Sequence, residues 1–123
     1  MTTRVPMLVW LTLLVGCATA APRPRLAPGA PGYVAPTEQT VISETEPSID
    51  VQEIYIQNNS SAAVVVTNVN VIECKNITPC GLVPLRIEVD PGQRRKVLSL
   101  RPVDAGMVYS YRYRYGWTVL PAR

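Results

Sequence analysis

The chain carries few of the side chains on which catalysis and metal binding usually depend. Its 123 residues include no His and three Cys, which are Cys17, Cys74 and Cys80. His is the commonest general base and a common metal ligand, so its absence excludes Ser-His-Asp and Cys-His catalysis. No Gly is followed by the Lys-Ser or Lys-Thr of a phosphate-binding loop. We therefore expect a protein that is not an enzyme and that holds no metal or cofactor.

Cys17 closes an apolar stretch at the start of the chain. One basic residue, Arg4, precedes a run of about ten apolar residues, which is typical of a secretory signal and too short to span a membrane. The run ends in Leu14-Val15-Gly16-Cys17. This motif resembles the lipobox of bacterial lipoproteins. The resemblance implies that residues 1–16 are a signal peptide and that Cys17 is acylated, so that lipid anchors the mature chain.

A second cleavage site follows the first. Ala18-Thr19-Ala20 is an A-x-A site, and cleavage there would release a secreted protein that begins at Ala21. Both alternatives place the protein in the bacterial cell envelope or outside it. For a lipoprotein, Ala18 after the acylated Cys resembles the signal for the outer membrane, so we expect a lipid-anchored protein that faces the periplasm.

Cys74 and Cys80 are the two cysteines that remain once Cys17 is acylated. Exported proteins fold in oxidising compartments, where paired cysteines usually form disulfides. Their five intervening residues differ from the Cys-x-x-Cys spacing of thiol oxidoreductases. We predict a structural disulfide between them.

Residues 17–50 read as a tether. Residues 18–36 contain five prolines and no apolar periodicity, which favours disorder or an extended spacer that reaches about 60 Å. Residues 37–50 are polar and acidic, with a short candidate edge strand at residues 40–43.

The globular domain is expected over residues 51–120, where apolar and polar residues alternate with the period of β-strands. The predicted strands span residues 51–57, 62–73, 85–89, 94–100 and 107–120. We expect the first two to pair as a hairpin across an Asn-Ser turn. The segment from Cys74 to Gly81 is predicted as a loop. No helical pattern is present, so the fold class is all-β.

The layout resembles a short immunoglobulin-like β-sandwich. The features that carry this likeness are the turn at residues 58–61, the Pro-Gly turn at residues 91–92 and a final aromatic strand. The chain lacks the inter-sheet cysteine pair and the core Trp of true immunoglobulin domains. The resemblance therefore implies only the architecture, a small antiparallel sandwich of five to seven strands.

The final strand combines an aromatic face with a basic one. The aromatic face contains Tyr109, Tyr111, Tyr113, Tyr115 and Trp117, and the opposite face carries Arg112 and Arg114. We interpret the aromatics as core and the arginines as solvated, with a partner-binding patch as the alternative. The candidate partner surface consists of Tyr55, Arg94, Arg95, Arg112 and Arg114. The formal charge of +3 is too small to indicate nucleic-acid binding.

Together these features favour a membrane-anchored lipoprotein that serves as a structural or complex-assembly module of the envelope, with a protein partner. The alternative is a secreted or periplasmic ligand-binding domain that uses the loops at its strand ends.

Overall fold

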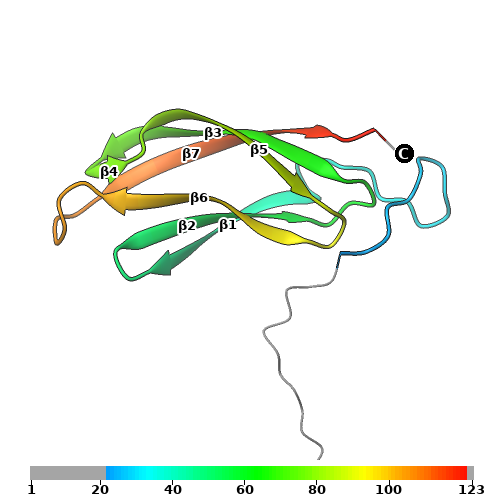
Figure 1. Cartoon of the computed structure of the whole chain (residues 1–123), viewed down its shortest axis with the longest axis horizontal. Coiled ribbons are helices and arrows are strands. Elements are labelled where there is room, and N and C mark those ends of the chain that lie inside the picture. The colour runs from blue at the N-terminus through cyan, green and yellow to red at the C-terminus, as the bar shows by residue number, and fades with distance from the viewer. Residues whose placement is uncertain (1–21, 122–123) are drawn as a thin grey trace, which may run out of the picture.

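The computed structural model describes residues 22–121, which form seven strands and no helix. The strands make two sheets, one with the order β1-β2-β6-β4 and the other with the order β5-β3-β7 (Figure 1). The strands are β1 Val41–Ser48, β2 Val51–Asn58, β3 Val64–Lys75, β4 Ile77–Thr78, β5 Gly81–Val89, β6 Arg94–Pro102 and β7 Ser110–Val119. The predicted all-β sandwich is confirmed. The signal peptide predicted at residues 1–16 and the acylated Cys17 lie outside the described residues.

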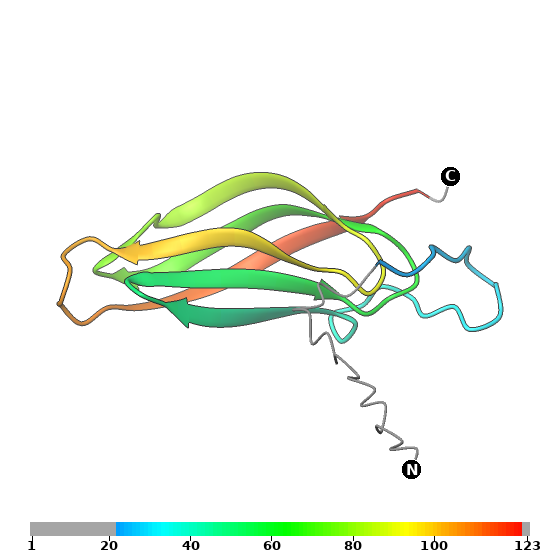
Figure 2. The same cartoon turned by 60° about the horizontal axis from the view of Figure 1, so that its bottom comes forward.

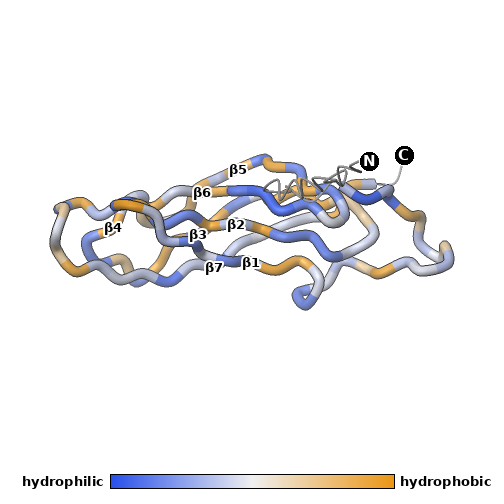
Figure 3. Tube along the Cα trace, turned by 90° about the horizontal axis from the view of Figure 1, so that it is seen from below, coloured by the Kyte–Doolittle hydropathy of each residue, from blue (hydrophilic) through white to orange (hydrophobic). Residues whose placement is uncertain are grey.

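Alternating side chains build the core between the sheets. Ile54 and Ile56 of β2 are fully buried and belong to the same core cluster as Val69 and Val71 of β3, which are almost fully buried. The residues between them point away from this layer, because successive side chains of a strand lie on opposite faces. Hydrophobic and hydrophilic residues accordingly interleave along the strands (Figure 3).

The predicted hairpin between residues 51–57 and 62–73 is wrong. β2 pairs with β1 and β6, whereas β3 pairs with β5 and β7, so the chain crosses between the sheets after β2. Buried Asn58 holds this crossing, because its amide nitrogen donates hydrogen bonds to the carbonyl oxygens of Ala62 at 2.7 Å and Val89 at 2.9 Å. The hydrogen bonds from the Asn58 side chain to the backbone therefore hold the crossing, as the backbone hydrogen bonds of a turn would hold a hairpin.

The domain begins before residue 51, which corrects the predicted boundary. β1 pairs with β2 over eight residues, from Val41 opposite Asn58 to Ser48 opposite Val51. The candidate edge strand at residues 40–43 is therefore the start of a full edge strand. Val41 is fully buried, which explains why the strand forms despite its acidic composition.

Residues 22–40, here called the N-terminal segment, pack on the sandwich. The segment folds over the end at which β7 finishes (Figures 1 and 2). Arg23 N–H donates to the Pro91 carbonyl at 2.7 Å, and Leu26 N–H donates to the Ser61 carbonyl at 2.8 Å. The expectation of a tether without contacts is therefore wrong for this part of the chain. The prolines lack N–H groups, but the residues between them supply donors to the turns that they meet.

Cys74 and Cys80 form the predicted disulfide, with their Cα atoms 6.1 Å apart. The loop that they close is not irregular throughout, because it contains β4, which pairs with β6. Ile77 of β4 is 4% exposed and belongs to the core. The disulfide therefore holds a loop that runs from one sheet to the edge of the other.

Within residues 22–121 no helix has the length and apolar character to cross a membrane.

Candidate functional site

The candidate partner residues lie in two groups that the structure does not bring together. Tyr55, Arg94 and Arg95 belong to β2 and β6 of one sheet, whereas Arg112 and Arg114 belong to β7 of the other. Each group is therefore assessed by itself.

The first group is satisfied by contacts within the domain. The guanidinium of Arg94 lies 3.8 Å from the ring centroid of Tyr55 and pairs with Glu44, at 3.2 Å, and with Glu46. Burial opposes the charge of Arg94, but hydrogen bonds to the two carboxylates dominate and raise its pKa. A hydrogen bond to Glu53 raises the pKa of Tyr55. These contacts join β1, β2 and β6, and we assign them to the stability of the sheet.

Arg95 also stabilises the domain, at the turn that connects β5 of one sheet to β6 of the other. Its Nη1 donates to the carbonyl oxygen of Glu88 at 2.9 Å, which ties β6 to the end of β5.

The tyrosines of β7 point between the sheets, as expected for an aromatic core. Because β7 is an edge strand, they lie at the side of the core and not at its centre. Tyr111, Tyr113 and Tyr115 are half-buried and pack against the core. Two of their hydroxyls reach across to β1: Tyr113 donates to Ser43 Oγ at 3.0 Å, and Tyr115 donates to the Val41 carbonyl at 2.9 Å. These bonds link the edge strands of the two sheets, which share no ladder of backbone hydrogen bonds.

Two hollows adjoin at β7. One, of about 520 Å³, is lined by Thr45, Ile72 and residues 111–114. The other, of about 400 Å³, is lined by Glu38, Tyr113, Arg114, Tyr115 and Trp117. Both include Tyr113 and Arg114, so they form one elongated depression, here called the β7 groove.

The β7 groove has an aromatic wall and a basic wall. Burial raises the pKa of Tyr111 and of Tyr115. Arg112 is 74% exposed and makes one ion pair, to Glu73 at 3.4 Å. Among the residues that the structure describes, no carboxylate pairs with Arg114. The groove therefore places Arg114, which has no carboxylate partner among the described residues, beside half-buried aromatic side chains.

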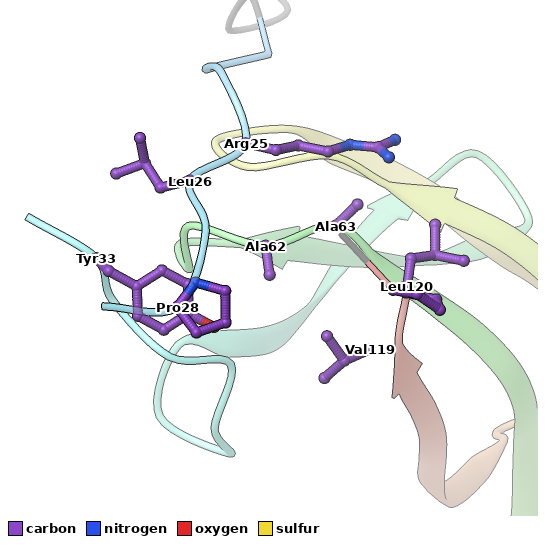
Figure 4. A pocket seen from close by; sticks show the side chains of 9 residues that line it. Arg25, Leu26, Pro28, Tyr33, Ala62, Ala63, Val119 and Leu120 are labelled. Atoms are coloured by element: carbon purple, nitrogen blue, oxygen red, sulfur yellow. The ribbon is translucent and has the colours of Figure 1, made fainter. Parts of the chain in front are cut away.

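A separate apolar cavity of about 250 Å³ lies at the strand end beneath the N-terminal segment. Figure 4 shows Pro28 and Tyr33 of the segment on one side and Val119 and Leu120 at the end of β7 on the other. Arg25 lines its rim, with its guanidinium bonded to Asp90 at 2.7 Å. This cavity was not predicted from the sequence, because four of its nine lining residues belong to a stretch that was expected to make no contacts. The signal that was available is the apolar Leu26 and Tyr33 within the proline-rich stretch.

Within residues 22–121 no three His, Cys, Asp or Glu side chains lie close enough together to hold a metal ion.

No family model, curated protein or solved structure matches this chain.

Proposed function

We propose that this protein is a membrane-anchored, non-enzymatic lipoprotein of the bacterial cell envelope, and that its β-sandwich is a complex-assembly module that binds a protein partner close to the bilayer. The proposal combines the lipobox that ends in Cys17 with the position of the N-terminal segment.

One observation carries the proposal: the chain meets the domain as early as Arg23, whose N–H is bonded to Pro91. Residues 18–22 separate this contact from Cys17. Fully extended, that stretch reaches at most about 20 Å. An acylated Cys17 would thus hold one end of the sandwich beside the lipid headgroups, rather than at the end of a 60 Å spacer. The strands run along the long axis of the domain (Figure 1), so the β7 groove extends away from the anchored end.

The anchor is tested by membrane fractionation of two variants in the full chain. Cys17→Ala should move the protein from the membrane to the soluble fraction, because it removes the acceptor of the acyl chains. The matched control Ala20→Leu alters the A-x-A site but leaves Cys17, so it should stay in the membrane. Intact-mass measurement of the mature protein should show Cys17 with added lipid. A lipid-free mature chain that begins at Ala21, with processing blocked by Ala20→Leu, would contradict the proposal.

The strand-end cavity favours a second candidate function, the binding of a small amphipathic ligand. Its wall is mainly apolar, and Arg25, which is paired with Asp90, lies at the rim, so apolar surface and a few polar groups meet as in many ligand sites. The probe 8-anilinonaphthalene-1-sulfonate has matching chemistry and gains fluorescence in apolar surroundings. Saturable binding that is lost in Ala63→Leu, which fills the cavity, would support this function. Equal fluorescence with the native chain and the variant would exclude this cavity as the binding site.

A further inference from the structure

The four sheet edges of the sandwich differ in how well they are protected. Edge strands expose unpaired backbone groups, and proteins usually protect them with proline, short length or charge. β1 contains Pro47, β5 contains Pro84, and β4 has two residues. β7 is ten residues long and contains no proline, and its charged side chains, Arg112 and Arg114, both lie on the outer face. In the described part of the chain it pairs with β3 alone, so its other edge is open.

The open edge of β7 coincides with the β7 groove. The lining residues run from Tyr111 to Trp117, a span of about 20 Å for a strand. Both hollows wrap the edge, because each is lined by tyrosines that point between the sheets and by Arg114 on the outer face. A strand added at the free edge of β7 would run along the part of this groove that is lined by Tyr111, Tyr113 and Thr45.

We propose that the partner binds by strand addition: an extended segment of another protein, with alternating apolar and acidic residues, pairs with the free edge of β7. This inference rests on the proposed function, because it names the surface that the assembly module uses. Backbone hydrogen bonds to β7 supply affinity, and alternate side chains supply specificity.

The side-chain preference follows from the two walls of the groove. Alternate residues of an added strand point between the sheets, where they meet Tyr111, Tyr113 and Thr45, and apolar side chains suit that position. The residues between them point outward beside Arg112 and Arg114, and carboxylates suit that position. Glu38 lines the groove near Trp117, so the acidic residues belong at the other end.

Charge also disfavours a second copy of this chain as the occupant in the register that is centred on the groove. If two β7 strands paired antiparallel about Tyr113, Arg112 of one copy would face Arg114 of the other. Like charges directly opposite each other destabilise a strand pair. A partner with carboxylates at these positions has the opposite effect.

The test uses the full mature chain in detergent and the peptide acetyl-Glu-Val-Glu-Val-Glu-Val-amide. Once residues 1–16 are removed, Trp117 is the sole Trp, so its fluorescence reports binding at the groove. Amide hydrogen exchange should slow at every second residue of β7, because in a β-ladder alternate N–H groups point toward the same neighbour. The peptide with Lys in place of Glu should bind at least about tenfold more weakly.

Two matched variants distinguish binding at the β7 edge from general electrostatic attraction between the peptide and the domain. Arg114→Glu should weaken binding of the acidic peptide by about tenfold or more. Arg86→Glu places the same charge change on β5, an exposed position at the opposite edge of the same sheet, and should leave binding unchanged.

Several results would overturn the inference. Equal losses in Arg114→Glu and Arg86→Glu would show non-specific attraction. Uniform or absent protection of β7 would exclude strand pairing. Protection that rises with protein concentration and without peptide would identify a second copy, and protection by anionic vesicles alone would identify a lipid surface. Peptide binding in detergent does not depend on the lipid anchor, so it tests this inference alone. Membrane retention of the Arg114→Glu variant does not depend on a partner, so it tests the anchor of the proposed function. Failure of one is therefore distinguishable from failure of the other.

Discussion

Asn58 offers the clearest test of how the two sheets are joined. Its side chain is fully buried at the crossing between β2 and β3 and makes four hydrogen bonds. The amide nitrogen donates to the carbonyls of Ala62 and Val89, and the amide oxygen accepts from the N–H and the hydroxyl of Ser60. We predict that Asn58→Ala lowers the free energy of unfolding by about 3 kcal/mol.

This magnitude follows from which partners would be left without a hydrogen bond. The Ala62 carbonyl and the Ser60 hydroxyl still bond each other, at 3.0 Å. The Ser60 N–H loses its side-chain acceptor and the Val89 carbonyl loses its side-chain donor, both at buried sites. Each unsatisfied buried group costs about 1–3 kcal/mol. A domain of this size has a total stability of roughly 5–15 kcal/mol, so the loss is large.

The assay is reversible urea unfolding of the oxidised protein, followed by the fluorescence of Trp117. The melting temperature should also fall by about 15 °C. The matched control is Asn59→Ala, because exposed Asn59 makes one side-chain bond, from Gln57 at 3.1 Å, and its loss should cost less than about 0.5 kcal/mol. A loss below about 1 kcal/mol for Asn58→Ala, or equal losses for the two variants, would refute the reasoning.

Two further predictions concern the disulfide and the tyrosines. Cys74→Ser should lower the free energy of unfolding by about 2 kcal/mol, as expected for a short closed loop, without weakening peptide binding at β7; free thiols in the purified protein, or lost binding at unchanged stability, would contradict a structural role. Stability should fall as the pH rises above 10, because burial raises the pKa of Tyr111 and Tyr115 above the value of 10.0 that they have when unfolded. The stabilisation from the neutral phenols is fully present below pH 10 and is lost as the pH rises through the folded pKa values. Absorbance titration should show that these phenols ionise at a higher pH than in the unfolded chain. Tyr111→Phe should reduce the loss of stability above pH 10.

Short-range patterns predicted the strands well and their partners less well. The alternation in β7 and the apolar positions of β2 and β3 revealed the strands, because a half-buried strand has a period of two. Pairing depends on residues far apart in the chain, so the crossing at Asn58 could not be read from its Asn-Ser turn. The disulfide was predictable, because two cysteines in an oxidised domain allow one pairing.

The candidate site was predicted in part. Arg112 and Arg114 were identified from their place in the final strand, but the groove beside them needs β1 on its far side, and β1 was expected only as a fragment. The N-terminal segment shows the limit of composition as a guide. A proline-rich stretch has few donors, yet Arg23 and Leu26 each find an acceptor in the turns at the strand ends, and these acceptors are visible only in three dimensions.

The docked N-terminal segment also has a mechanical consequence. If the proposed lipid anchor and the proposed partner on β7 are both in place, a pull between them would reach the domain first at Arg23, through one backbone hydrogen bond and the neighbouring Arg25–Asp90 ion pair, which is partly exposed. Both are weaker than the eight-residue ladder between β1 and β2. They would part first, and the hydrogen bonds that Leu26 and Val34 make with Ser61 would have to break next before residues 22–40 could extend to about 60 Å while the sandwich stays folded. The segment would thus be compact without force and extended under force, so that the sandwich could follow a moving partner without unfolding.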